Sequence, residues 1–299
     1  MTTEVQPLKI QTLAVVGLGL IGASLALALK KAGMVGHLLG VDSAEEVCHQ
    51  ALQRSMVDAI VTLEQAAAQA DILILCVPVA KTERVLRNCL PHLRPQTIVT
   101  DTGSTKENVV IAAKAALGER VAQFIPAHPI AGREQHGLDA ALVDLFQGKK
   151  VVLCPLQENR QDDVHLVRMI WACVGAQCHV LSALQHDAVF ATNSHLPHLL
   201  AYALVTQIIN AEDAQMKLDF AGSGFRDFTR IAGSSAEIWR DICFGNRTAL
   251  LQELATYQTI LTQLKNMIEQ NQDETLHRFF QRASATRLAW QKKNGADQA

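Results

Sequence analysis

Eight short apolar runs between residues 12 and 182 constrain the fold of this chain more than any other feature. Each run is rich in Val, Ile or Leu and has little polar alternation, which is typical of strands buried on both faces of a parallel sheet. The runs are TLAVV (12–16), HLLGVD (37–42), AIVT (59–62), ILILCV (72–77), TIVTD (97–101), QFIPA (123–127), KVVLC (150–154) and QCHVLS (177–182). Because amphipathic stretches separate them, we predict an α/β fold in which helices wrap a mostly parallel sheet.

The pattern changes after Ser182, because no further run rich in β-branched residues follows. We therefore expect two domains, a sheet domain at residues 8–182 and an all-α domain at 183–290. The first helix of the second domain is apolar on more sides than a surface helix tolerates. A second copy of the chain is the simplest cover for it, so a homodimer through the helical domain is predicted. The predicted helices lie near 183–210, 212–221, 235–244, 246–270 and 272–290.

Composition excludes several classes of partner. The 299 residues include 27 Lys and Arg against 29 Asp and Glu, and the net charge of −2 supplies no extended field for nucleic acid or an acidic membrane. No apolar run is long enough for a signal peptide or a bilayer span. The seven cysteines are odd in number and scattered, as reduced thiols are. We expect a cytoplasmic protein that acts on a small molecule and binds neither nucleic acid nor membrane.

A glycine-rich turn follows the first predicted strand and opens a helix that runs to about Lys31. Its G-x-G-x-x-G spacing in this context is the fingerprint of a dinucleotide site in a Rossmann-type domain. We expect the first glycine to permit the tight turn, the second to let a pyrophosphate approach, and the third to let helix and strand pack closely. Free N–H groups at the helix start then hold the anion. The predicted cofactor-binding turn consists of Gly17, Leu18, Gly19, Leu20, Ile21 and Gly22.

The end of the second predicted strand indicates which dinucleotide is bound. Asp42 lies there, where a carboxylate accepts both ribose hydroxyls of the adenosine half and repels a 2′-phosphate. No cation follows in residues 43–46, so NAD is favoured over NADP. Val77 and Pro78 are predicted to line the adenosine side, although a strand end stopped by proline explains them equally well.

Two segments at strand ends contain candidate catalytic residues. Ser104 lies in DTGSTK (101–106), where either catalysis or the capping of the following helix explains a hydroxyl. His128 lies in AHPIAG (127–132), directly after a strand, where it faces the predicted cofactor crevice. A neutral imidazole is well matched to taking a hydroxyl proton as hydride departs, so His128 is the predicted general base. A capping or solvated histidine is the alternative.

Two segments of the helical domain contain candidate substrate ligands. His195 and His198 in SHLPH share one helix face and are predicted to line a pocket for an anion, or else to be satisfied helix histidines. No metal site is predicted, because no carboxylate or cysteine ligand accompanies them. In the loop expected at residues 221–235, Arg230 is predicted to hold a carboxylate or, alternatively, to cap helix carbonyls. Trp239 is predicted to wall the pocket.

Simpler roles are expected for two neighbouring pairs of residues. We expect His186 and Asp187 to form a surface pair, and Arg226 and Asp227 to form an ion pair with each other.

These segments together resemble one family, the arogenate and prephenate dehydrogenases of tyrosine biosynthesis, also called cyclohexadienyl dehydrogenases. The resemblance runs from about residue 12 to 285. It is carried by VVGLGLIGASLA, DTGSTK, AHPIAG, SHLPH and GFRDFTRIAGSS…IWRDI in the family's order. It implies NAD-dependent oxidative decarboxylation of prephenate, arogenate or both.

The resemblance also implies residue roles. His128 is the base on the ring hydroxyl, with Ser104 hydrogen-bonded nearby. His195, His198 and Arg230 hold the substrate, and one of them reaches across a dimer interface.

We expect two elaborations of the family to be absent from this chain. The short leader leaves no space for a chorismate mutase domain and the tail leaves none for a regulatory ACT domain, so tyrosine feedback is expected to act at the active site. The polar tail is also consistent with a junction to a further enzyme. Prephenate and arogenate differ in a keto group and an ammonium, and Asp187 is a candidate to favour the ammonium.

Two other functions stay open from the residues alone. A β-hydroxyacid dehydrogenase has the same two-domain plan but uses a lysine base in the helical domain, for which Lys217 and Lys265 are the candidates. A dinucleotide-sensing regulator without turnover leaves His128, the SHLPH segment and Arg230 unexplained. NADH formation with prephenate or arogenate separates the three.

Overall fold

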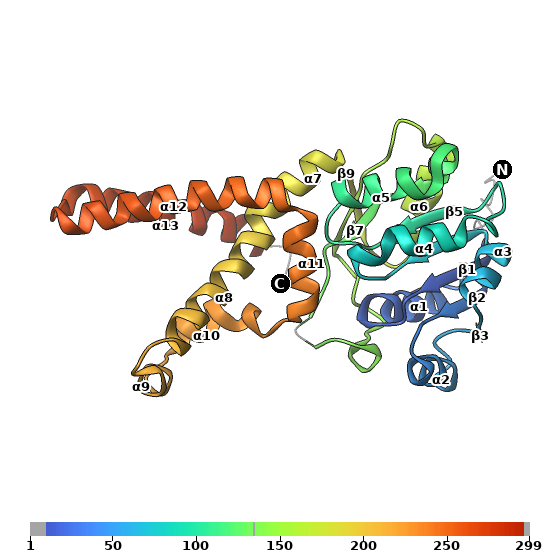
Figure 1. Cartoon of the computed structure of the whole chain (residues 1–299), viewed down its shortest axis with the longest axis horizontal. Helices are drawn as coiled ribbons and strands as arrows, with labels where there is room; N and C mark the ends of the chain where they lie inside the picture. The colour runs from blue at the N-terminus through green and yellow to red at the C-terminus, as the bar shows by residue number, and fades with distance from the viewer. Residues whose placement is uncertain (1–9, 134, 296–299) are drawn as a thin grey trace, which may run out of the picture. The chain divides into compact units, whose positions relative to one another are not determined.

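The computed structural model describes residues 10–133 and 135–295. Contacts divide the chain into two compact units, one that extends to Leu250 and one that starts at Leu251. The first unit contains both sheets and the helices that surround them. The second consists of most of helix α12 and all of helix α13 (Figure 1).

The main sheet of the first unit has six parallel strands in the order β3-β2-β1-β4-β5-β6. The predicted fold class is thereby confirmed. The strand order reverses between β1 and β4, and ligands of such sheets bind outside the carboxyl ends of the strands at this point. The strands are β1 (Ile10–Val16), β2 (Val35–Val41), β3 (Ala59–Ile60), β4 (Ile72–Leu75), β5 (Ile98–Asp101) and β6 (Phe124–Ile125).

Both faces of this sheet are buried, as the continuous apolar runs predict. In β1, Leu13 and Val15 pack into one core cluster while Ala14 and Val16 pack into the other. Helices α1 and α6 contribute to the first cluster, and α3, α4 and α5 to the second. The helices are α1 (Leu20–Ala32), α2 (Glu45–Gln53), α3 (Leu63–Gln69), α4 (Thr82–Cys89), α5 (Glu107–Leu117) and α6 (Gln161–Cys173).

The sixth predicted strand is not one strand but two. Pro126 separates β6 from β7 (Ala127–Pro129), and β7 pairs antiparallel with β8 (Lys150–Leu153), which pairs parallel with β9 (Gln177–Val180). The eight predicted runs therefore divide between a six-stranded and a three-stranded sheet. Proline has no N–H for a sheet ladder, which explains why the chain changes sheets at this residue.

A long helical segment follows β9. It consists of α7 (Ala183–Phe190), a π-helical turn (Ala191–His195) and α8 (Leu196–Ile209), which replace the single predicted helix at 183–210. The Ser182 hydroxyl accepts from Gln185 N–H, and the Gln185 side chain accepts in turn from Ser182 N–H, so a capping box begins α7.

The predicted loop at 221–235 is mostly helical, which corrects that expectation. It contains α10 (Ser223–Thr229) and a 3₁₀ turn (Arg230–Gly233) between α9 (Ala214–Asp219) and α11 (Ala236–Gly245). The glycines of this stretch lower its helix propensity, but packing of α10 and the 3₁₀ turn against α8 overrides that preference.

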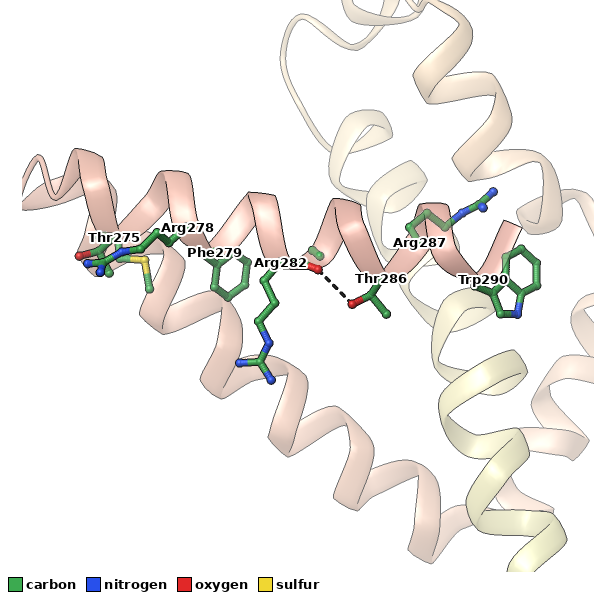
Figure 2. A pocket seen from close by; sticks show the side chains of 9 residues that line it. Thr275, Arg278, Phe279, Arg282, Thr286, Arg287 and Trp290 are labelled. Atoms are coloured by element: carbon green, nitrogen blue, oxygen red, sulfur yellow. Dashed lines mark hydrogen bonds between the residues drawn. The ribbon is translucent and has the colours of Figure 1, made fainter. Parts of the chain in front are cut away.

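The second unit is built on a helical hairpin. Helix α12 (Arg247–Glu269) begins in the first unit and turns back through Asn271, at φ +50°, into α13 (Asp273–Gly295) (Figure 1). A cavity of about 800 Å³ lies on it, lined mainly by α13 (Figure 2). In the part of the chain that the structure describes, no helix is both long and apolar enough to span a bilayer.

Candidate active site

A crevice of about 1560 Å³ lies in the first unit and brings together most of the predicted site residues. It is lined by the residues after β1, β4, β5 and β7 and by the helical segments around His198 and Trp239. Leu18 and Gly22 are not among the lining residues. The predicted residues that do line it are Gly17, Gly19, Leu20, Ile21, Asp42, Val77, Pro78, Ser104, His128, His195, His198, Arg230 and Trp239.

The glycine-rich turn fits a dinucleotide. A side chain on Gly17, at φ +94°, would place its Cβ 2.4 Å from Cys76 O, and a Cβ on Gly22 would lie 1.9 Å from Gly17 O. These two positions therefore exclude other residues. Gly19 has no atom within 4 Å of its Cβ position, and no side chain caps the N-terminus of α1. This leaves open space in front of a helix N-terminus, which is the cradle that a pyrophosphate requires.

The Asp42 carboxylate is held in place beside this turn. Its Oδ2 accepts from Leu18 N–H at 2.7 Å and its Oδ1 from Ala44 N–H at 3.0 Å. Two side chains of the α4 region, Lys81 and Arg84, also line the crevice and were missed by reasoning from the sequence. No local sequence pattern indicates these two residues, because they lie far from the glycine-rich fingerprint in the sequence.

His128 is the first member of a buried hydrogen-bonded chain. Its Nδ1 lies 2.7 Å from His186 Nε2, and His186 Nδ1 lies 2.7 Å from Asp187 Oδ1. His186 is 0% exposed and Asp187 is 1% exposed, so the predicted surface pair is wrong. The pair is buried because α7 packs against α5. The Phe190 ring contacts both histidines, edge-on at His128 and tilted at His186.

Asp187 also caps helix α5. Its Oδ1 accepts from Lys106 N–H at 2.8 Å and its Oδ2 from Glu107 N–H at 2.9 Å. The carboxylate is therefore committed to protein donors and does not line the crevice, which corrects the hypothesis that it reads an ammonium. The alternative that Ser104 caps this helix is also wrong, because a residue from α7 does so.

A buried ion pair lies beneath the two catalytic candidates. Lys106 Nζ lies 2.5 Å from Asp101 Oδ2 and donates to Ala127 O at 2.8 Å, and its side chain is 0% exposed. Asp101 also accepts from Gly103 N–H and Ala127 N–H. The pair thus links the Ser104 loop to the strand that bears His128. The sequence showed DTGSTK, but nothing local indicated that its lysine points inward.

Electrostatics favour a neutral His128. Burial, foremost, and then the nearby His186, Lys106 and His195 hold the pKa of His128 well below its usual value of 6.5. An uncharged imidazole with a lone pair is the form that takes a proton from a hydroxyl.

The two histidines of SHLPH differ in their surroundings. His195 Nδ1 lies 3.1 Å from Asn246 Nδ2, and burial lowers its pKa to about 4 against the opposite effect of the Ser104 backbone. His198 Nδ1 donates to Ser194 O at 2.9 Å, and its ring stacks on Trp239 with the centroids 3.5 Å apart. Nδ1 of His195 therefore faces Asn246, whereas His198 is held through Nδ1 and by its stack on Trp239.

The two arginines of the segment at residues 221–235 lie in different surroundings. Arg230, in the 3₁₀ turn, lines the crevice, and its charge contributes to lowering the pKa of His198 after burial. Arg226 and Asp227 are exposed on α10, and among the described residues no ion pair joins them. In the same residues, no group of three or more His, Cys, Asp and Glu is arranged to hold a metal ion.

Two family models match this chain in succession. Residues 25–180 match the nucleotide-binding domain of prephenate dehydrogenase, and residues 182–282 match its dimerization domain. Together they cover well over half of the chain.

Individual relatives agree with the family models. The cyclohexadienyl dehydrogenase of Zymomonas mobilis is 32% identical over 280 residues, which is 93% of this chain and 95% of that protein.

Two solved structures are also similar. The prephenate dehydrogenase of A. aeolicus, in complex with hydroxyphenyl propionate and NAD⁺, superposes with a TM-score of 0.89 at 31% identity, over 95% of this chain and 99% of that one. The arogenate dehydrogenase of Synechocystis superposes with a TM-score of 0.80 at 32% identity, over 94% and 100%. The glycine-rich cradle, the buried histidine chain and these matches lead to one conclusion: the chain belongs to the prephenate dehydrogenase family.

Proposed function

We propose that this protein catalyses the NAD-dependent oxidative decarboxylation of prephenate, arogenate or both, which forms 4-hydroxyphenylpyruvate or tyrosine. The observation that carries the proposal is the placement of a neutral, hydrogen-bonded His128 in the same crevice as the dinucleotide cradle. Membership of the family gives the substrate class, because its relatives are prephenate, cyclohexadienyl and arogenate dehydrogenases.

The cofactor is NAD, held by the glycine-rich turn and selected by Asp42. Bound there, it supplies a hydride acceptor. Gly17 and Gly22 shape the turn, Gly19 and the α1 N-terminus receive the pyrophosphate, and the Asp42 carboxylate disfavours a 2′-phosphate. Val77 and Pro78 line the adenosine side.

His128 removes the proton from the ring hydroxyl of the substrate. Hydride leaves the carbinol carbon as the proton moves to His128, and a dienone forms that is conjugated to the carbon bearing the carboxylate. Loss of carbon dioxide then gives an aromatic ring. Aromatisation supplies the driving force, so the protein mainly positions the ring and takes one proton. A positioned base contributes about 10² to 10⁴-fold to such a step.

Other residues of the crevice hold the substrate's anionic groups. Arg230 is positioned for a carboxylate, and His198, held flat by Trp239, offers its second ring nitrogen. Ser104 lies in the loop that Lys106 and Asp101 brace and lines the same crevice as His128. His195, near the Ser104 backbone, helps to hold that loop in place.

Other functions have less support. Of the lysines that a β-hydroxyacid dehydrogenase would require, Lys217 forms an ion pair with Asp213 and Lys265 with Glu269. A sensor without turnover has no use for the His128 chain.

A homodimer formed through the helical domain completes the proposal. Its support is the description of the second family model and the exposed apolar side chains of the helical segments. These side chains include Ile209, Leu251, Leu261, Ile268, Phe280 and Leu288. We place the domain boundary at residue 182 and the protein in the cytoplasm. Size-exclusion chromatography with light scattering measures the mass of the protein in solution and so tests the homodimer.

One assay tests the function. The purified chain is given NAD with prephenate or with arogenate, and NADH and carbon dioxide are measured. Release of both products in equal amounts with either substrate is expected. NADH without carbon dioxide contradicts the proposed reaction, and the ratio of kcat/KM for the two substrates gives the preference.

A further inference from the structure

The chain of hydrogen bonds from Asp187 through His186 to His128 has a fixed direction. Asp187 accepts one helix N–H on each carboxylate oxygen, from Lys106 and Glu107, so the carboxylate is an acceptor on both sides. A third short contact joins its Oδ1 to His186 Nδ1 at 2.7 Å. Because the carboxylate has no proton to give, His186 Nδ1 must carry the hydrogen in this bond.

The direction of the next bond follows. Burial, partly offset by Asp187, lowers the pKa of His186, so the ring is neutral and carries one hydrogen only. That hydrogen is on Nδ1, which leaves Nε2 as an acceptor. Nε2 lies 2.7 Å from His128 Nδ1, so His128 Nδ1 is the donor. His128 is then left with an unprotonated Nε2.

We propose that His186 and Asp187 are positioning residues that hold His128 in the tautomer whose Nε2 is unprotonated and available to the substrate hydroxyl. This inference rests on the proposed function, in which His128 is the base. A free imidazole chooses between two tautomers, and a base in the wrong tautomer cannot take the proton. The fixed ring orientation is supported by the ring contacts of Phe190 with both histidines.

The same chain stabilises the state after proton transfer. The hydroxyl proton bonds to Nε2, and His128 becomes an imidazolium that still donates from Nδ1 to the neutral His186. That bond becomes charge-assisted, with the Asp187 carboxylate behind it. The other charged or titratable groups around the two rings are Lys106, Asp101 and His195. Lys106 opposes the positive charge on both rings, whereas Asp187 and, to a smaller extent, Asp101 favour it at His186.

Nitrogen NMR of the whole protein labelled with ¹⁵N-histidine tests the tautomer directly. The His128 signals are identified by their absence in His128→Asn. We expect a protonated Nδ1 and an unprotonated Nε2 in the unsubstituted protein near neutral pH. A proton on Nε2 instead overturns the inference, and this tautomer is measured in the unsubstituted protein.

Two variants separate positioning from packing. In His186→Leu no acceptor faces His128, so we expect the proton to move to Nε2 and kcat to fall about 10² to 10³-fold with little change in KM. His186→Gln keeps an acceptor, so the tautomer and at least about a tenth of kcat should return. His165→Leu, on the exposed face of α6, is the matched control and should leave the His128 tautomer and kcat unchanged.

The outcomes distinguish this inference from the proposed function. Equal loss of kcat in His186→Leu and His186→Gln, with the His128 tautomer unchanged in both, assigns His186 a structural role only and overturns the inference. Absence of turnover with either substrate in the unsubstituted protein overturns the proposed function, whereas the nitrogen signals still report whether His186 sets the tautomer.

Discussion

Lys106 and Asp101 form an ion pair at 2.5 Å in which the lysine side chain is 0% and the aspartate side chain 3% exposed. Buried charges are costly unless each has its partner, and removal of one partner leaves the other uncompensated. This pair also lies next to His128, whose pKa it influences through Lys106. It therefore links the stability of the domain to the chemistry of the crevice.

Lys106→Met is expected to lower the free energy of unfolding by about 3 to 5 kcal/mol, because Asp101 then lacks its cation. In variant protein that remains folded, the pKa of His128 should rise, since a nearby positive charge is gone. The acid limb of kcat/KM should then move to higher pH. Denaturant unfolding and a pH–rate profile measure the two effects. Lys114→Met removes an exposed pair with Glu158 and should change neither.

His128→Asn should retain NAD binding and lose most turnover. The amide cannot take the hydroxyl proton, so kcat should fall by about 10² to 10⁴-fold. The dissociation constant of NAD, measured by fluorescence titration, should stay within about twofold, because the cradle lies in the glycine-rich turn. A variant with unaltered kcat would remove His128 from the role of base.

Arg230→Ala should raise KM strongly and affect kcat less, because a charge-assisted contact to a substrate carboxylate is lost. Arg226, four residues earlier and exposed on α10, gives the matched control. Steady-state kinetics on Arg226→Ala should resemble those of the unsubstituted protein. The reverse pattern would assign the carboxylate to Arg226.

Asp42→Asn should weaken the discrimination against NADP. The carboxylate repels a 2′-phosphate, whereas the amide carries no charge and still accepts one hydrogen bond from Leu18 or Ala44. The ratio of kcat/KM for NAD to that for NADP should fall at least about tenfold, or about 1.4 kcal/mol. Glu45→Gln, on the exposed start of α2, is the control. An unchanged ratio would exclude Asp42 as the selector.

Stability should depend on pH through His195. Its pKa is lowered to about 4 in the folded protein, mainly by burial, whereas it is near 6.5 when unfolded. The unfolded chain therefore binds a proton first as the pH falls, and this residue's contribution is complete above pH 6.5 and lost between about 6.5 and 4. Its size is about 3 kcal/mol. Urea unfolding gives the free energy of unfolding at pH 7.5 and at pH 5. The difference between these two values should be smaller in His195→Gln than in the unsubstituted protein. An equal difference in both proteins would contradict this assignment.

The parts of the fold that local sequence determines were predictable. The buried strands and the glycine-rich turn were expected where they occur, because apolar runs and the steric limits at Gly17 and Gly22 act over a few residues. NAD and the family were likewise predicted and are confirmed. The proposed roles of the individual site residues stay predictions.

Other features arise only when distant segments meet. The burial of His186 and Asp187 depends on α7 packing against α5, some 80 residues earlier in the chain. The helix α10 forms in a glycine-containing stretch because it packs on α8. Neither contact leaves a signal in the local pattern of residue types, so a surface pair and a loop were the natural expectations.

The division of the strand at Pro126 has a consequence for how such an enzyme evolves. The cradle belongs to one sheet and His128 to the other, so no shared ladder of backbone hydrogen bonds dictates the separation between hydride acceptor and base. Asp101 and Lys106, which bond the start of β7, set much of that spacing with side chains. A single substitution at Asp101 or Lys106 can therefore change the distance between hydride acceptor and base while both sheets keep their architecture.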